Sequence, residues 1–151
     1  MVNMSLLKQL REETGISFSL CKKALEEAKD NLESAKKLLN QWGAEKVKDK
    51  ADRKTSEGAL FSYVHHNKKV VALVEILCES DFVANNQDFQ KMGQEIAMQI
   101  ASLNPQNVEE LLQQDYIRDP KKKIEDLIKD AVLRFGENTK ITRFIRWELG
   151  I

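Results

Sequence analysis

The sequence has few of the features that mark secreted, membrane-spanning or nucleic-acid-binding proteins. Its 151 residues include only two cysteines, which suggests a reducing compartment and disfavours a disulfide. No apolar run approaches the roughly 20 residues that a membrane-spanning helix needs, and the first residues show no apolar signal core. Basic and acidic residues both number 24, which argues against nucleic acid as the main partner. We therefore expect a cytoplasmic protein with no membrane or nucleic-acid partner, or an organellar matrix protein whose targeting segment has been removed.

The sequence also offers little for bond-making chemistry. His65 and His66 are its only histidines, and neighbouring residues on a strand point to opposite faces, so we do not expect both to bind one metal ion. The glycines stand alone, which leaves no loop of the kind that cradles nucleotide phosphates. A small enzyme that uses one histidine with Cys78 is an alternative that the spacing disfavours. We predict no metal, no cofactor and no enzymatic activity.

Helical patterns fill the first third of the chain. Apolar residues recur at helical spacing within residues 5–15, 17–28 and 32–43, with Ser5 as a candidate cap of the first helix and Gly43 as the end of the third. Three such helices can close on one another, so we predict a bundle over residues 1–43 that resembles the ubiquitin-associated (UBA) fold. Charged residues dominate residues 44–57, which predicts a solvated linker helix.

Strand and helix patterns alternate beyond the linker. Two apolar runs flank a turn at Asn67 and Lys68, which predicts a β-hairpin over residues 58–77. Amphipathic helices follow, one ending at Asn104 and one opening at Pro120, and the alternating pattern of residues 141–149 predicts a last strand. We therefore predict an α+β fold, with a three-stranded antiparallel sheet covered by helices in a core domain over residues 58–151.

The hairpin's second strand stops abruptly at an acidic cap. Ser80 and Asp81 can accept hydrogen bonds from the free amides of a helix that begins near Phe82. A large aromatic side chain is then held at a helix entry. From spacing alone we would interpret Phe82 as packed with Phe89 under the following helix, and Asp81 as a helix cap.

Four blocks of this sequence occur in the same order in one protein family. They are LKQLREETGISFSLCKKAL at residues 7–25, GALFSYVHHNKKV at 58–70, CESDFVANN at 78–86 and GENTKITRFIRWELG at 136–150. The chain resembles translation elongation factor Ts, the nucleotide exchange factor of the GTPase elongation factor Tu, in a short form. The resemblance extends from near the first residue to the last.

The resemblance implies a guanine nucleotide exchange factor that binds elongation factor Tu with GDP, dislodges Mg²⁺ and promotes GDP release during translation elongation. By position it assigns Ser80, Asp81, Phe82 and Val83 to the contact that dislodges the ion, with Ser80 in place of the family's threonine. This reverses the interpretation of Phe82 from spacing alone.

The resemblance implies two further contacts. Arg11, Phe18 and Ser19 of the bundle would grip the GTPase, and Phe18 replaces a methionine that is usual in the family. Longer relatives carry a second sheet-and-helix unit, whereas this chain has room for one. A homodimer through the last strand, near residues 144–147, would restore the double core, because an apolar edge strand invites pairing. No cysteine lies in that strand, so a disulfide cannot hold such a dimer there.

Two other functions compete with nucleotide exchange. A UBA-like adaptor that binds ubiquitin or a peptide would account for the residues up to Gly43 and for nothing beyond. Ribosome binding through the lysine-rich linker is a weaker alternative. If it occurred, the affinity would fall steeply as the salt concentration rises.

Overall fold

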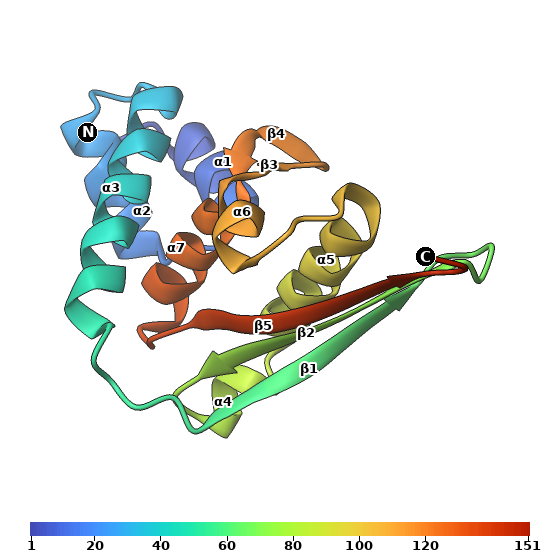
Figure 1. Ribbon diagram of the computed structural model, residues 1–151. Helices are drawn as coiled ribbons and strands as arrows, with labels where there is room; N and C mark the ends of the chain where they lie inside the picture. Colours follow the sequence, from blue (N-terminus) through green and yellow to red (C-terminus); the bar gives the residue numbers. More distant parts are fainter. The chain divides into compact units, whose positions relative to one another are not determined.

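The computed structural model describes residues 1–151, which form seven helices and five strands (Figure 1). The chain divides into two units. The first unit comprises residues 1–52 and 129–136, and the second comprises residues 53–128 and 137–151. The α+β fold class predicted from the sequence is confirmed. The domain limits of 1–43, 44–57 and 58–151 stay a prediction.

Three helices and part of a fourth make up the first unit. Asn3 caps the first helix by accepting hydrogen bonds from the amides of Ser5 and Leu6 at 2.9 and 3.2 Å, so the expectation of Ser5 as the cap is wrong. Ser5 stands two residues after the cap, inside the helix. Ser17 caps the second helix. The helices are α1 (Met4–Thr14), α2 (Phe18–Glu27), α3 (Leu32–Lys50) and the last part of α7 (Ile124–Phe135).

The third helix does not end at Gly43 as the sequence predicts. It runs on to Lys50, so residues 44–50 continue α3 and form no separate linker helix. Gly43 is needed for another reason: a Cβ atom there would lie only 3.0 Å from the carbonyl oxygen of Lys129. The glycine lets α7 approach α3 closely within the first unit. The unit's core includes these buried side chains: Leu7, Leu10, Ile16, Cys21, Leu25, Leu39 and Leu133.

The second unit is built on a three-stranded antiparallel sheet. Its strands are β1 (Glu57–Val64), β2 (Val70–Cys78) and β5 (Lys140–Glu148), in the order β1-β2-β5. The predicted hairpin is confirmed, with Val64 paired to Val71 at the turn end and Glu57 to Cys78 at the other. The last strand therefore lies at a sheet edge, beside β2.

Helix α5 (Gln87–Leu103) covers one face of this sheet (Figure 1). Phe61 of β1 packs against Phe89 of α5, with ring centroids 5.9 Å apart. A side chain at Gly93 would collide with the Phe61 ring, so this glycine allows the helix to lie close to the sheet. The opposite face keeps large apolar side chains exposed, namely Leu60, Val64, Leu73, Ile145 and Trp147.

Short elements complete the second unit. Pro120 does not open a helix, because it lies in a two-stranded sheet and α7 begins only at Ile124. The side chain of Gln99 stabilises this two-stranded sheet. Its amide donates to the carbonyl of Asp115 and its oxygen accepts from the amide of Ile117, both at 3.0 Å. No helix combines the length and apolar character needed to cross a membrane. These elements are α4 (Asp81–Ala84), α6 (Val108–Gln113), β3 (Asp115–Tyr116) and β4 (Asp119–Lys123).

Candidate functional site

The strand β2 ends in a short segment that presents one aromatic ring to solvent. The side chain of Phe82 is 88% exposed, whereas Phe89 is fully buried. The two rings do not pack together, so the interpretation from spacing alone is wrong for Phe82. An aromatic ring with so little contact to its own chain is unusual in a folded protein. Its apolar surface is available to a partner.

Ser80, rather than Asp81, caps the one-turn helix α4. Its hydroxyl oxygen accepts a hydrogen bond from the amide of Val83 at 3.3 Å. Asp81 occupies the first helical position and is exposed, where its negative charge is favourable at the helix N-terminus. Val83 is 8% exposed and anchors the turn in the second unit. Asp81 and Phe82 therefore face solvent, while Ser80 and Val83 hold the backbone that carries them.

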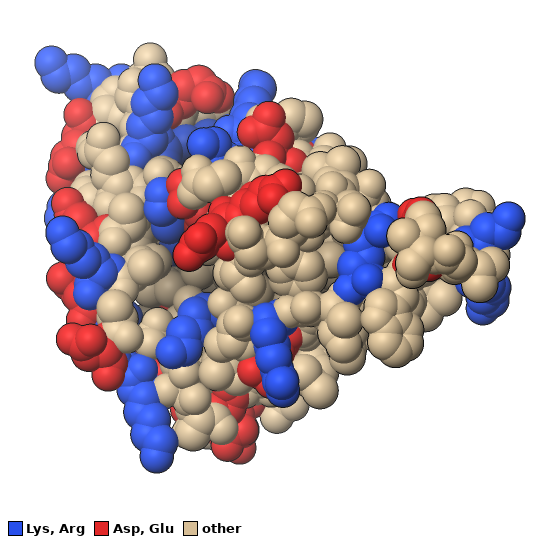
Figure 2. All heavy atoms as spheres, in the orientation of Figure 1, with Lys and Arg blue, Asp and Glu red and all other residues tan.

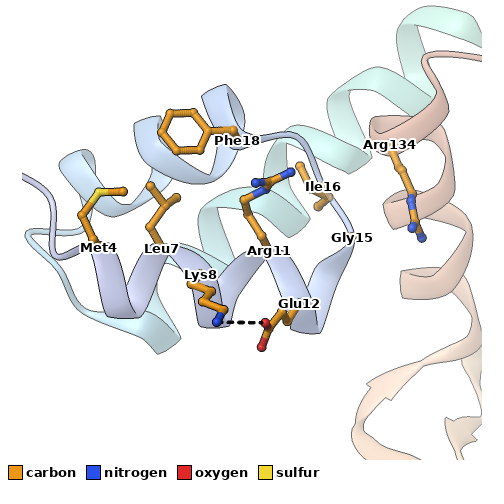
Figure 3. Close-up of a pocket in the computed structure, with 9 residues that line it drawn as sticks. All are labelled: Met4, Leu7, Lys8, Arg11, Glu12, Gly15, Ile16, Phe18 and Arg134. Carbon is orange, nitrogen blue, oxygen red and sulfur yellow. Dashed lines mark ion pairs between the residues drawn. The ribbon is translucent and has the colours of Figure 1, made fainter.

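The first unit has a groove of about 480 Å³ beside α1 (Figure 3). Its floor is apolar and includes Leu7 and Ile16, which belong to the bundle core. Two residues predicted as a partner contact meet at this groove: the Arg11 guanidinium lies 5.8 Å from the centroid of the Phe18 ring, and Phe18 is 45% exposed. The residues that line the groove are Met4, Leu7, Lys8, Arg11, Glu12, Gly15, Ile16, Phe18 and Arg134.

Ser19 and Arg134 change the predicted composition of this contact. Ser19 is exposed but does not line the groove, and its hydroxyl lies 3.4 Å from that of Ser17. Arg134 of α7 does line it, and its guanidinium occupies the space that a side chain at Gly15 would need. Sequence reasoning missed Arg134, since nothing in the local pattern of α7 shows that this side chain reaches Gly15.

The histidines and Cys78 lie at opposite ends of the hairpin. His65 follows the last residue of β1, whereas Cys78 pairs with the first, so the eight residues of β1 separate them by roughly 25 Å. Burial, with help from Glu137, raises the pKa of the Cys78 thiol to about 11, which makes it a poor nucleophile. The enzyme that would combine these groups is excluded by their separation.

The histidine end of the hairpin is polar and partly basic. The hydroxyl of Tyr63 lies 3.1 Å from His65 Nδ1, and the two imidazole rings have centroids 4.2 Å apart. Lys68 and Lys69 are exposed in the turn, and Figure 2 shows Lys and Arg side chains at this end. No group of three or more histidine, cysteine or carboxylate side chains in the structure could hold a metal ion.

Comparison with known proteins agrees with the four sequence blocks. The family model described as "Elongation factor TS" matches residues 79–150, a range that includes the exposed turn and β5. Elongation factor Ts of Thermosipho melanesiensis is 34% identical over 99% of this chain and 100% of that protein. Elongation factors Ts of Coprothermobacter proteolyticus and Nitratidesulfovibrio vulgaris are each 37% identical, over 99% of this chain and 98% and 97% of their own.

These likenesses define the class of protein as a translation elongation factor, which acts in protein biosynthesis. The chain belongs to the elongation factor Ts family. The alignment with the Thermosipho protein extends over 195 positions, more than the 151 residues of this chain. That relative therefore has residues without a counterpart here.

Proposed function

We propose that this chain is a guanine nucleotide exchange factor for the GTPase elongation factor Tu. It binds the GDP-bound GTPase, dislodges Mg²⁺ and promotes GDP release, without making or breaking bonds itself. It acts in the cytoplasm during translation elongation. The observation that carries the proposal is the Phe82 side chain, which is 88% exposed at the end of a buried strand. Membership of the elongation factor Ts family supports it.

The exposed turn would act as a wedge. Phe82 inserts between elements of the GTPase domain, and the carboxylate of Asp81 engages polar groups beside the Mg²⁺ site. A GTPase holds GDP through its phosphate loop and this ion, which neutralises phosphate charge. Displacing those elements weakens the hold on GDP. Because coupling between two ligands is reciprocal, the nucleotide in turn weakens the hold of this factor, which is then free to act again.

The groove beside α1 supplies a second contact in this proposal. An apolar side chain of the GTPase would lie on the floor near Leu7 and Ile16, against the half-exposed ring of Phe18. Arg11 and Arg134 would face an acidic group, because a guanidinium binds a carboxylate through two parallel hydrogen bonds. Ser19 lies beside this contact rather than in it.

We also propose a homodimer through β5. Within residues 144–147, Ile145 and Trp147 are 50% and 69% exposed, while Arg146 turns to the other face and donates to the carbonyl of Ala101 at 3.0 Å. Leu73 pairs with Ile145, so the apolar surface continues onto β2. Contiguous apolar surface of this kind marks an interaction site.

The release of fluorescent GDP from elongation factor Tu tests the exchange proposal. In a stopped-flow measurement we expect the native chain to accelerate GDP release. With Phe82→Ala the accelerated rate should be about tenfold lower or more, since a central hot-spot side chain contributes about 2 kcal/mol or more. The fold should be unchanged, because the ring makes few contacts with its own chain. Leu103→Ala removes another exposed apolar side chain, 47% exposed, and should have no effect. Equal release rates with native and Phe82→Ala chains would refute the role of Phe82.

A further inference from the structure

Two glutamates join the turn that carries Phe82 to the loop before β5. One oxygen of Glu137, Oε1, accepts hydrogen bonds from the backbone amides of Glu79 at 3.1 Å and Ser80 at 2.9 Å. In the opposite direction, Glu79 Oε2 accepts a hydrogen bond from the backbone amide of Asn138 at 2.5 Å. Each carboxylate thus binds the backbone of the other's segment. We call Glu79 and Glu137 the glutamate clasp.

The clasp also orients the cap of α4. Ser80 Oγ donates its hydrogen to Glu137 Oε2 at 2.5 Å and accepts from the amide of Val83 at 3.3 Å. A hydroxyl has only one hydrogen, so its bond to Glu137 directs a lone pair to Val83. Glu137 therefore receives three hydrogen bonds from the turn, and a charged acceptor makes such bonds stronger than a neutral one does.

The loop that carries Glu137 is itself held in place. Asn138 and Thr139 are 4% and 2% exposed. The side-chain amide of Asn138 donates to the carbonyl of Arg53 at 2.9 Å, and the guanidinium of Arg53 lies 3.7 Å from the other oxygen of Glu79. The clasp thus connects the turn to a buried part of the second unit. These contacts restrain the backbone of the turn.

The turn needs such support because it has little stability of its own. Helix α4 has four residues, and a single helical turn is unstable in water without outside contacts. The ring of Phe82 cannot position itself by packing, since it is 88% exposed. We infer that Glu137 is a positioning residue for nucleotide exchange, which holds the turn so that Phe82 points outward in the geometry that inserts into the GTPase. This inference rests on the proposed function.

Amide hydrogen exchange in the free protein tests the clasp without any GTPase. In Glu137→Ala the amides of Glu79 and Ser80 lose their acceptor, so we expect each to exchange about tenfold faster or more. Amides of the β1–β2 ladder, such as that of Ala72, which pairs with Tyr63, should keep their protection. Glu109→Ala, at an exposed position of α6, is the matched control and should change neither set. Unchanged exchange at Glu79 and Ser80 would refute the clasp.

The dependence of GDP release on factor concentration tests what the clasp does. For Glu137→Ala we expect the maximal rate of release to fall about tenfold, because a displacement of about 1 Å has costs of this size or larger. The half-saturating concentration should change less, since the groove beside α1 is untouched. A loss of folded protein would instead raise the half-saturating concentration of the factor and leave the maximal rate unchanged, because enough factor still saturates the GTPase. If Glu137→Ala does not fold, Glu137→Gln carries the test, with a fall of a few-fold expected from its weaker, neutral acceptor.

The double variant separates this inference from the proposed function. If Glu137 acts through Phe82, Phe82→Ala with Glu137→Ala should release GDP no more slowly than Phe82→Ala alone. Additive losses would refute a role through Phe82. A normal rate with Phe82→Ala would instead refute the proposed function. A slow Phe82→Ala beside normal Glu137→Ala and Glu137→Gln chains would refute the positioning role alone.

Discussion

At the scale of single residues, the exposed and buried side chains of the Phe82 turn have opposite roles. The side chains of Phe82 and Asp81 are exposed to solvent, whereas Cys78, at the end of β2, is fully buried. Its thiol lies 3.3 Å from the carbonyl of Ser80, and burial raises its pKa to about 11. The thiol is therefore a packing group, and its ionisation opposes the folded state.

The raised pKa of Cys78 predicts how stability changes at alkaline pH. Below pH 9 the thiol is protonated in both states, so the full stability is present. Between about pH 9 and 11 the unfolded chain ionises first, and the free energy of unfolding should fall by up to about 3 kcal/mol, at about 1.4 kcal/mol for each pKa unit. Urea unfolding at pH 8 and pH 10.5 measures this.

Cys78→Ala is the control for this prediction, because it lacks the ionising group and should show a smaller fall over the same range. Some fall will remain, since burial and Glu95 raise the pKa of Tyr116 to about 12. Equal falls for the native chain and Cys78→Ala would contradict the assignment to Cys78.

At the scale of elements, one buried side chain connects α5 to the β3–β4 hairpin. Gln99 is fully buried, and two of its three hydrogen bonds satisfy backbone groups of Asp115 and Ile117. Glu95, one turn earlier, accepts hydrogen bonds from the side chains of Tyr116 and Arg118. The hairpin therefore depends on α5 for its position, since only two residue pairs join its strands β3 and β4.

Gln99→Ala should lower the free energy of unfolding by about 1–3 kcal/mol. The substitution removes the partner of the part-buried amide of Ile117 and of the carbonyl of Asp115, and an unsatisfied group has a cost of that size. Chemical denaturation measures it, and Gln87→Ala, at an exposed position of the same helix, should change stability by less than about 0.5 kcal/mol. Equal stabilities of the two variants would show that water replaces the lost bonds.

At the scale of the whole molecule, the three-stranded sheet of the second unit is covered by α5 on one face only. The uncovered face has four rows of paired residues, one of which joins Val64, Val71 and Trp147. Trp147 and Ile145, which β5 contributes to this face, are both exposed. A second copy of the same face would bury this surface symmetrically, as most homodimers do.

The dimer proposal predicts a concentration-dependent mass. Sedimentation equilibrium should show twice the 17.4 kDa mass of the chain at micromolar concentration. Ile145→Lys should sediment as a monomer, because it places an unpaired charge in the interface. Leu103→Lys, exposed elsewhere on the second unit, should stay a dimer. A native chain that sediments as a monomer throughout would rule out this dimer.

The sequence alone predicted the types of the main elements, but not the β3–β4 sheet. The alternation of residues 58–77 and 141–149 predicted three strands, and helical spacing predicted α1, α2 and α5, because both periods follow from backbone geometry. Element limits were less accurate: Gly43 read as a helix end, and Pro120 as a helix start. Gly43 is needed where α7 approaches α3, and Pro120 lies in the β3–β4 sheet; a local pattern shows neither.

The identity of the candidate turn also came from the sequence, through motifs that run along the chain. What only the tertiary structure decided is which side chains are exposed and what holds them. Spacing favoured a packed Phe82, yet the ring is exposed, since Phe89 packs on Phe61 instead. Glu137 lies 57 residues from Ser80 and Arg134 lies 119 from Gly15 in sequence. Contacts over such separations depend on how the elements pack, and no local pattern encodes them.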